Sequence, residues 1–493
     1  MTAIASKKNN ILFFAVGIIL LLRLACIGLM GMMPQDAYYD FYGQHLALSY
    51  YDHPPAIAYI LRLFTEIFGK KVFVLKLADT VISFFTIFFF YRLAFLFLGR
   101  HRAQRAALLF FSTLMLTILS LISTPDVPLL LCWSLALLAL YQAIFLEKKI
   151  YWAWSGICIG LAFDSKYTGI FLVFGLILFL LLSKKYRKFI FSPWLFLCLF
   201  LFLLTISPVI IWNYQNDFAS FRFQSASRME SMNGFHIDLT SFAGVLGHQS
   251  AILMPILFFA LIYFIFRTLK KYKLRFFDIE PQKLFLLCFF IPVFVGFFCI
   301  SLFYWVKLNW MMPAYITGII WVSIYISKKW VNYQVICSLI VHLVLAVEVL
   351  WYPVAINSDD TWVGWDDLAK QVKEIKNNYP DAFIFSADDY KTSAVLNFYL
   401  NEMVYGQNII GKRALQFDFI GSDLAALAGK NSLFIDSDPH FENGSENKPP
   451  IELYNYFDTV IAIAPIVVQK NGHAVRKFSV YVCKNYHPKN GRQ

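Results

Sequence analysis

Charged residues that could carry out chemistry stand in four short segments between long apolar stretches. These segments are 50–55 (Tyr-Tyr-Asp-His-Pro-Pro), 123–128 (Ser-Thr-Pro-Asp-Val-Pro), 164–168 (Asp-Ser-Lys-Tyr-Thr) and 305–310 (Trp-Val-Lys-Leu-Asn-Trp). A carboxylate in such a segment can accept the proton of a hydroxyl group, and a cationic side chain can stabilise a leaving anion. The four segments are therefore candidates for a site of group transfer.

The first segment lies within a polar stretch, residues 34–71, that is expected to form two helices at the membrane surface. Tyr38, Tyr42 and Leu46 recur every four residues, which is typical of a helix that lies in the interface. A second helix is expected over 56–68. Pro54 disfavours helical geometry at His53 and so predicts a stiff loop that carries Asp52 and His53. The alternative is that Asp52 only caps the second helix.

Asp126 and Lys166 are charged residues directly beside apolar runs. An ionised carboxylate at that position is costly unless it faces a polar cavity, although a helix N-cap would explain Asp126 equally well. The ammonium of Lys166 requires an anion there, and a phosphate, Asp164 or Asp126 would serve. Lys307 lies between two tryptophans, and its alternative role is that of an interfacial anchor.

The elements that position these segments follow from composition. The chain has 493 residues and a formal net charge of +12; 59% of its residues are hydrophobic and only 15% are charged. A soluble domain of this size cannot cover so much apolar surface, because such domains contain roughly 45–50% apolar residues. We therefore predict a polytopic α-helical membrane protein and exclude a soluble enzyme, a disordered chain and a disulfide scaffold.

Apolar runs predict about eleven transmembrane helices. The spans lie near 11–33, 72–98, 106–122, 127–146, 150–164, 168–183, 189–212, 246–267, 284–304, 309–327 and 331–352. With this number, every joint rich in lysine and arginine falls on one side, which the positive-inside rule assigns to the cytoplasm. The N-terminus is thus expected in the cytoplasm, and the four charged segments are expected on the outer face.

Residues 353–493 are less apolar and are expected to form a small α/β domain outside the membrane. Trp365, Leu368, Val372 and Ile375 have helical spacing. A second helix is expected over 392–400, and strands are expected at 382–386, 433–436, 460–468 and 478–483. The predicted domains are therefore 1–352, a transmembrane domain that includes the external loop 34–71, and 353–493.

Several motifs together resemble membrane glycosyltransferases of the GT-C class, in particular the bacterial branch related to protein O-mannosyltransferases and the lipid A aminoarabinose transferase. The matching pieces are Asp36-Ala37-Tyr38-Tyr39, Tyr50 to Pro55, Ser123 to Asp126, Ser165-Lys166-Tyr167, Trp212 to Asn216, Lys307 to Trp310 and Asp388-Asp389-Tyr390. They follow the family's order over most of the chain. The resemblance implies a helical membrane bundle, a periplasmic C-terminal domain and a polyprenyl-phosphate-linked sugar as donor.

The resemblance also assigns roles to residues. The family usually has an Asp-Glu pair where this chain has Gln35-Asp36, so the catalytic base is expected to be Asp36 or Asp126. Lys166, His53 and Lys307 are expected to bind the donor phosphate. The donor and acceptor pocket is expected to contain Tyr39, Tyr51, Asp52, Tyr167 and Asn309.

The expected reaction is an inverting transfer of a sugar from undecaprenyl phosphate to lipid A or core lipopolysaccharide at the bacterial inner membrane. Protein O-glycosylation is the alternative within this class, and secondary transport is the alternative from another class. No nucleic-acid partner is expected. A divalent metal is conceivable with Asp52 and His53 as ligands, although two ligands do not define a metal site.

Overall fold

A computed structural model describes residues 2–227, 236–273, 275–356, 358–441 and 448–488, without the side chains of 2–11, 13, 226 and 227. The chain divides into two compact units. One, which we call the helical unit, comprises Met1–Ile27, His53–Ile57 and Lys76–Leu345. The other, which we call the sheet unit, comprises Gly28–Asp52, Ala58–Leu75 and Ala346–Gln493. Each is described by itself.

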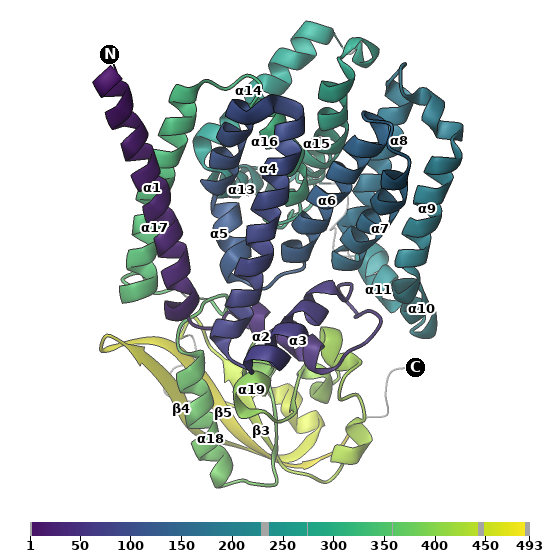
Figure 1. Ribbon diagram of the computed structural model, residues 1–493. Helices are drawn as coiled ribbons and strands as arrows, with labels where there is room; N and C mark the ends of the chain where they lie inside the picture. The colour runs from purple at the N-terminus through teal and green to yellow at the C-terminus, as the bar shows by residue number, and fades with distance from the viewer. Residues whose placement is uncertain (1, 228–235, 274, 357, 442–447, 489–493) are drawn as a thin grey trace. The chain divides into compact units, whose positions relative to one another are not determined.

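The helical unit is a bundle of apolar helices (Figure 1). Its helices are α1 (Thr2–Leu29), α4 (Val72–Phe111), α5 (Leu114–Leu121), α6 (Asp126–Ile144), α7 (Ile150–Ser165), α8 (Phe171–Leu182), α9 (Pro193–Thr205), α10 (Ser207–Gln215), α11 (Ala219–Arg222), α13 (Leu239–Leu253), α14 (Pro255–Tyr272), α15 (Pro281–Ile300), α16 (Met312–Val322) and α17 (Lys328–Trp351). Large apolar side chains point outward all along the bundle, as expected where lipid surrounds the helices.

In the described part of the chain, four helices are long and apolar enough to cross a membrane, and up to seven if each of three bent helix pairs is one span. The four are α4, α6, α15 and α17, and two shorter apolar helices cover Tyr167–Leu182 and Met312–Val322. The chain is thus a multi-pass membrane protein, while the number of eleven spans stays a prediction.

Several predicted spans are interrupted. The stretch 106–122 is divided where α4 ends at Phe111 and α5 begins at Leu114. The stretch 246–267 is not one straight helix, because α13 ends at Leu253 and α14 begins at Pro255 after a bend of 114°. Pro255 lacks the N–H that would continue the helix, and Met254 has a positive φ of 66°. The stretch 189–212 is bent by 44° between α9 and α10, where a proline again follows the break.

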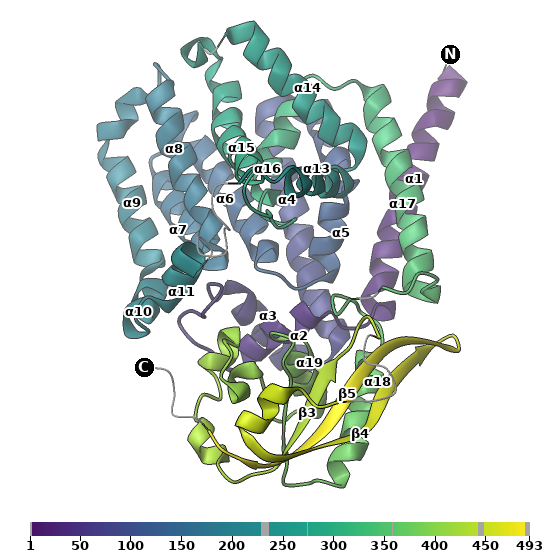
Figure 2. The same cartoon turned by 180° about the vertical axis from the view of Figure 1, so that it is seen from behind.

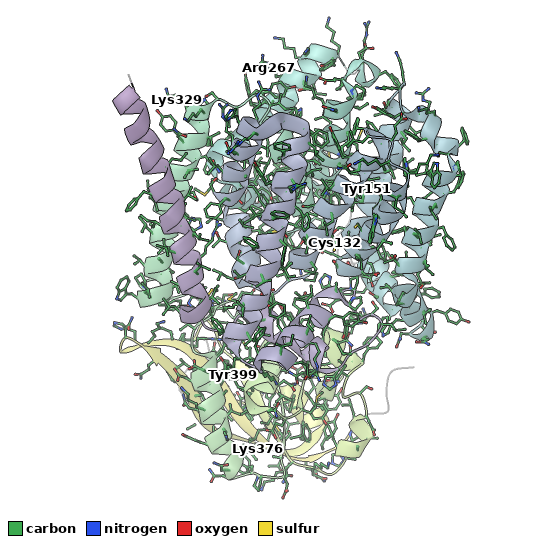
Figure 3. All side chains as sticks on the ribbon, viewed as in Figure 1. Cys132, Tyr151, Arg267, Lys329, Lys376 and Tyr399 are labelled. Atoms are coloured by element: carbon green, nitrogen blue, oxygen red, sulfur yellow. The ribbon has the colours of Figure 1, made fainter. Side chains whose placement is uncertain are left out.

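Basic residues of the helical unit gather at one end of the bundle. Figure 3 shows Arg267 of α14 and Lys329 of α17 at the same end. The connection between α8 and α9, which carries a run of lysines and an arginine, also lies there, as both views of the ribbon show (Figures 1 and 2). This segregation agrees with the predicted sidedness of the basic joints, whose orientation in a membrane stays a prediction.

The sheet unit contains a five-stranded sheet in the order β2-β1-β3-β5-β4. Its strands are β1 (Phe383–Phe385), β2 (Val404–Tyr405), β3 (Ser432–Ser437), β4 (Phe457–Lys470) and β5 (His473–Tyr486). β1 pairs in parallel with β2 and β3, and β5 pairs antiparallel with β3 and β4. Helices α18 (Trp365–Asn377) and α19 (Lys391–Leu400) belong to the same unit. The four strands and two helices predicted for the tail are all present, whereas the two-residue strand β2 was not predicted.

The sheet unit also includes most of the first loop. This loop contains the two predicted helices, α2 (Pro34–Gln44) and α3 (Ala56–Phe68), and α2 packs against α19. The Tyr38 ring stacks on Tyr390 with centroids 4.2 Å apart, and the backbone N–H of Tyr51 donates to the side chain of Gln416 at 2.7 Å. The loop and the tail, more than 300 residues apart in sequence, therefore share one core.

Candidate active site

The central feature of the helical unit is a buried cluster of three site residues. The ammonium of Lys166 lies 2.9 Å from each oxygen of the Asp126 carboxylate, and the amide of Asn309 donates to Oδ2 of Asp126 at 2.6 Å. The Asp126 side chain is 0% exposed and that of Lys166 is 6% exposed. An ion pair so deeply buried loses its hydration, so it persists only when hydrogen bonds satisfy both partners. The structure therefore brings a candidate base, a candidate phosphate ligand and a pocket residue into contact.

Helix ends place this ion pair. Asp126 is the first residue of α6, where its negative charge is favoured by the helix dipole. Lys166 directly follows the last residue of α7 and has extended backbone angles of φ −157° and ψ 139°. The N-cap alternative for Asp126 is wrong, because Pro125 occupies the N-cap position and no side chain caps the helix. Asp126 instead lies in a polar cluster with Lys166 and Asn309. Among the anions considered for Lys166, the structure shows Asp126 as its partner.

A row of polar side chains on α4 supports the loop that carries Asp126. Lys76, Thr80 and Ser83 each donate a hydrogen bond to a backbone carbonyl in the last turn of α5, at 2.8, 2.8 and 3.0 Å. The hydroxyl of Ser123 donates to Oδ2 of Asp79 at 2.7 Å. These bonds satisfy carbonyl groups at the end of a helix that would otherwise be unpaired in an apolar surrounding. They fix the segment 123–126 against α4.

The other predicted residues of the helical unit lie near these segments in sequence. Tyr167 shares a hydrogen bond of 2.5 Å with the hydroxyl of Ser220 in α11. Lys307 is exposed, on the same loop as Asn309, and His53 is half-buried between Asp52 and Pro54. Their roles in binding a phosphate stay predictions.

The remaining predicted residues belong to the sheet unit and have local partners there. Asp36 is fully buried, and its carboxylate accepts from the backbone N–H of Met33 at 3.0 Å at the start of α2. Asp52 accepts hydrogen bonds from the hydroxyls of Tyr38, at 3.2 Å, and Tyr42. Tyr39 is buried, and its ring packs edge-on against that of Tyr42. These contacts give Asp36 and Asp52 structural roles in the loop, and their catalytic roles stay predictions.

Asp40 and Ser220 are buried polar residues that were not predicted as site residues. Asp40 is 2% exposed and accepts a hydrogen bond of 2.5 Å from Gln44. Burial raises the pKa of Asp40, while the nearby Lys70 and Gln44 oppose that rise. Asp40 lies four residues after Asp36 on a helix, so the same-face spacing was a signal, whereas Ser220 has no recognisable pattern around it.

A metal site is not indicated among the residues that the structure describes, because no three His, Cys, Asp or Glu side chains there could hold one ion together. Asp52, one of the two conceivable ligands, accepts from two tyrosine hydroxyls.

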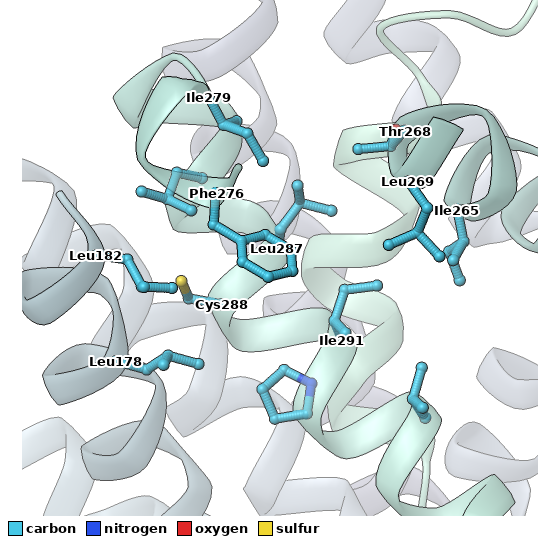
Figure 4. Close-up of a pocket in the computed structure, with 13 residues that line it drawn as sticks. Leu178, Leu182, Ile265, Thr268, Leu269, Phe276, Ile279, Leu287, Cys288 and Ile291 are labelled. Carbon is cyan, nitrogen blue, oxygen red and sulfur yellow. The ribbon is translucent and has the colours of Figure 1, made fainter. Parts of the chain in front are cut away.

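An apolar cavity of about 430 Å³ opens between α8, α14 and α15 (Figure 4). Its lining is aliphatic and aromatic apart from Cys288 and Thr268. A second apolar hollow of about 350 Å³ shares Ile265 and Val295 with the first and reaches Leu302 at the far end of α15. From Leu284 to Cys299, α15 thus borders apolar space along 15 residue steps, or roughly 22 Å at 1.5 Å per residue. That length is about three quarters of the thickness of a bilayer core, about 30 Å.

Comparisons with known proteins agree with this architecture. A family model described as dolichyl-phosphate-mannose-protein mannosyltransferase matches residues 52–212. Lipid A galacturonosyltransferase RgtD of Rhizobium johnstonii is 25% identical over 299 residues, which span 60% of this chain and 60% of that relative. The crystal structure of ArnT from Cupriavidus metallidurans in the apo state matches with a TM-score of 0.63 at 12% identity, covering 96% of this chain and 98% of ArnT.

The resemblance to GT-C glycosyltransferases is confirmed. The structure of ArnT bound to undecaprenyl phosphate also matches, with a TM-score of 0.61, 14% identity and coverage of 95% of this chain and 97% of ArnT. The similarity in fold to ArnT therefore extends over nearly the whole chain. The matched segment 52–212 contains five predicted site residues, which are Asp52, His53, Asp126, Lys166 and Tyr167.

Proposed function

We propose that this chain is an inverting glycosyltransferase that moves a sugar from a polyprenyl-phosphate donor to lipid A or core lipopolysaccharide. The observation that carries the proposal is the buried cluster of Asp126, Lys166 and Asn309. A carboxylate, an ammonium and an amide held together at the end of apolar helices are expensive to bury, and such groups in membrane proteins generally serve function.

The cluster can perform the transfer in one displacement. Asp126 accepts the proton of the acceptor hydroxyl while that oxygen attacks the anomeric carbon. The bond from the anomeric carbon to the phosphate oxygen breaks, its electron pair stays on the phosphate, and the configuration inverts. Lys166 stabilises the charge that develops on the departing phosphate. The Asp126 carboxylate neutralises Lys166, and Asn309 fixes the orientation of that carboxylate.

A lipid-linked donor fits the surroundings of the cluster. Its phosphate would bind near Lys166, with Lys307 and His53 as further cations, and its isoprenoid tail would stay in the apolar phase. The apolar hollows along α15 offer an apolar surface for such a tail. The similarity to ArnT bound to undecaprenyl phosphate supports this class of donor.

Lipid A is favoured as acceptor because the matching curated relative is a lipid A galacturonosyltransferase. We place the reaction on the periplasmic face of the inner membrane, with the N-terminus in the cytoplasm and the sheet unit outside. The clustering of basic residues at one end of the helical bundle supports this orientation. Asp36 stays an alternative base, and Tyr39, Tyr51, Asp52 and Tyr167 stay proposed pocket residues.

Mass spectrometry of envelope lipids tests the proposal. Lipid A and core oligosaccharide from cells that carry the gene should contain a sugar that is absent from cells without it. A plasmid copy should restore that sugar, and an Asp126→Asn copy expressed at the same level should not. Identical lipid spectra with and without the gene would refute lipid A as the acceptor.

Protein glycosylation is a second candidate, favoured by the match to a protein mannosyltransferase model over 52–212. The same strains decide between the two, since this alternative predicts that the gene-dependent sugar appears on Ser or Thr of envelope proteins and not on lipids. Purified protein with a labelled polyprenyl-phosphate sugar and either lipid A or protein as acceptor gives the direct measurement.

A further inference from the structure

A glutamine outside the reactive cluster links that cluster to two further helices. Gln249 of α13 is fully buried, and both ends of its side-chain amide are bonded. Its Nε2 donates to the backbone carbonyl of Leu308 at 2.9 Å, and its Oε1 accepts from the Tyr315 hydroxyl of α16 at 2.5 Å. A buried amide is costly unless its polar atoms are paired, so this arrangement defines the position of Gln249 closely.

The Leu308 carbonyl, which accepts the hydrogen bond from Gln249, belongs to the peptide group that joins Leu308 to Asn309. Fixing this peptide plane restricts the backbone from which the Asn309 side chain extends. The Asn309 amide then reaches Oδ2 of Asp126 at 2.6 Å. A continuous chain of hydrogen bonds and one peptide unit thus connects Tyr315, through Gln249, to the candidate base.

Helix α13 also contacts Trp305, at the start of the loop 305–309 that carries Asn309. The Trp305 ring packs so closely on Gly244 that a Cβ at position 244 would lie 2.5 Å from the ring. The rings of His248 and Trp305 meet nearly at right angles, with centroids 5.6 Å apart. Helix α13 therefore contacts the loop 305–309 through Gly244 and His248 at one end and through Gln249 at the other.

We propose that Gln249 is a positioning residue, which holds the loop 305–309 so that Asn309 orients the carboxylate of Asp126 for proton transfer. This inference rests on the proposed glycosyl transfer and extends it to a helix that does not touch the reacting groups. Tyr315 orients Gln249, and Gly244 provides the space for Trp305. A displacement of about 1 Å in such a support can cost about 100-fold in rate.

Transfer by the purified full chain at saturating polyprenyl-phosphate sugar and acceptor measures the effect on kcat. Gln249→Ala should lower kcat by about 10- to 100-fold, and Tyr315→Phe, which keeps the bond to Leu308, should lower it less. Both variants should reach the membrane at the wild-type level and elute as the same single peak. A change in KM with kcat unchanged would overturn the proposal.

A double-mutant cycle separates positioning from a general loss of stability. If Gln249 acts through Asn309, then Gln249→Ala should cause little further loss in an Asn309→Ala background. If the two residues act independently, the fold losses multiply, and the proposal is overturned. This comparison needs only ratios of kcat among four variants, so partial instability common to them does not produce the expected pattern.

Two glycines of α13 supply a matched pair. Gly244→Ala should lower kcat because the added methyl displaces Trp305, whereas Gly247→Ala should leave it unchanged, since no atom lies within 4 Å of a Cβ at position 247. Equal effects of the two substitutions would contradict a role for the Gly244 contact. An inactive wild-type protein would instead refute the proposed function, whereas an active wild type with an unaffected Gln249→Ala variant would refute only this inference.

Discussion

At the scale of single residues, the environment of Asp126 explains why three different polar groups are needed in one apolar place. The carboxylate is 0% exposed, so the charge of Lys166 and the amide of Asn309 replace the water that it has lost. Removing one partner leaves the other buried charge uncompensated, which is more costly than removing both. Variants at this site must therefore be read with their membrane level and elution profile beside their activity.

Asp126→Asn and Lys166→Ala are each expected to reduce sugar transfer by at least about 100-fold, the usual range for a lost acid–base or electrostatic group. The Asn variant keeps the shape of the side chain while it removes the proton acceptor. Transfer by the purified proteins is the measurement. Lys188→Ala is the control, because Lys188 forms an exposed ion pair with Glu147 at 3.3 Å and should contribute little. Normal turnover in both site variants would rule out the assignment.

A residue of the sheet unit should make stability depend on pH. Burial raises the pKa of Asp388 to about 7, and the negative charge of the nearby Asp359 makes a smaller contribution in the same direction. An unfolded chain has an aspartate pKa of about 3.9, so the folded state binds more protons between about pH 4 and pH 7. The stabilising contribution is therefore present at low pH and is lost as the pH rises toward 7.

Asp388→Asn should remove part of this dependence. Thermal unfolding of the full chain in detergent at pH 5, 6 and 8 is the measurement, and the decline in stability of the sheet unit should be smaller in the variant than in the wild type. Asp436, whose pKa burial raises to about 6, should contribute the remaining decline in the same direction. Parallel curves for the variant and the wild type would contradict the assignment to Asp388.

At the scale of elements, close helix contacts depend on glycine. Gly156 and Gly160 lie four residues apart on α7 and face α9, where a Cβ at either position would collide with the Cys198 backbone or the Thr205 side chain. Small residues at this spacing allow membrane helices to approach each other closely. The contact between α7 and α9 matters for function because α7 leads directly into Lys166.

Gly160→Ala should therefore destabilise the protein by about 1–3 kcal/mol, the usual cost of overpacking. A lower midpoint of thermal unfolding in detergent is the expected result. Gly296→Ala in α15 is the matched control, since no atom lies within 4 Å of a Cβ there and alanine is the better helix former. If both substitutions gave the same midpoint, the close approach of α7 and α9 would not be important.

At the scale of the whole molecule, the first loop is not a separate appendage of the helical bundle. Residues 28–52 form part of the same compact unit as the tail, with aromatic stacking of Tyr38 on Tyr390 and of Tyr51 on Phe419. The predicted domain boundary after residue 352 stays a prediction. Because the loop and the tail pack together in one compact unit, they must lie on the same side of a membrane.

Cysteine labelling tests that sidedness. A maleimide that cannot cross membranes should modify Thr459→Cys in the sheet unit on intact spheroplasts, and should modify Lys329→Cys only after lysis. Both positions are exposed in the structure. The unsubstituted chain controls for its native cysteines. The reverse pattern would place the sheet unit in the cytoplasm and would refute a periplasmic reaction.

The sequence alone determined the class of protein and most of its local structure. Apolar runs and helical spacing are local properties. The sequence therefore predicted apolar membrane helices, and outside them it predicted α2, α3, α18, α19 and four strands. The breaks before Pro255 and within 189–212 were not predicted, although a proline marks each break. Asp126 and Lys166 were also predicted, because charged groups beside hydrocarbon stand out in a sequence, whereas Asn309 was predicted through the resemblance to GT-C glycosyltransferases.

Only the tertiary structure decided which of these groups meet. The sequence left a phosphate, Asp164 and Asp126 as possible partners of Lys166, and the structure pairs Lys166 with Asp126 across 40 positions. It also joined Gln249 to the loop before Asn309 and joined the first loop to the tail. Such contacts link residues far apart in the chain, and their energies depend on burial and on the geometry of several helices at once. No local pattern of residue types records that information, which is why the folded chain was needed to supply it.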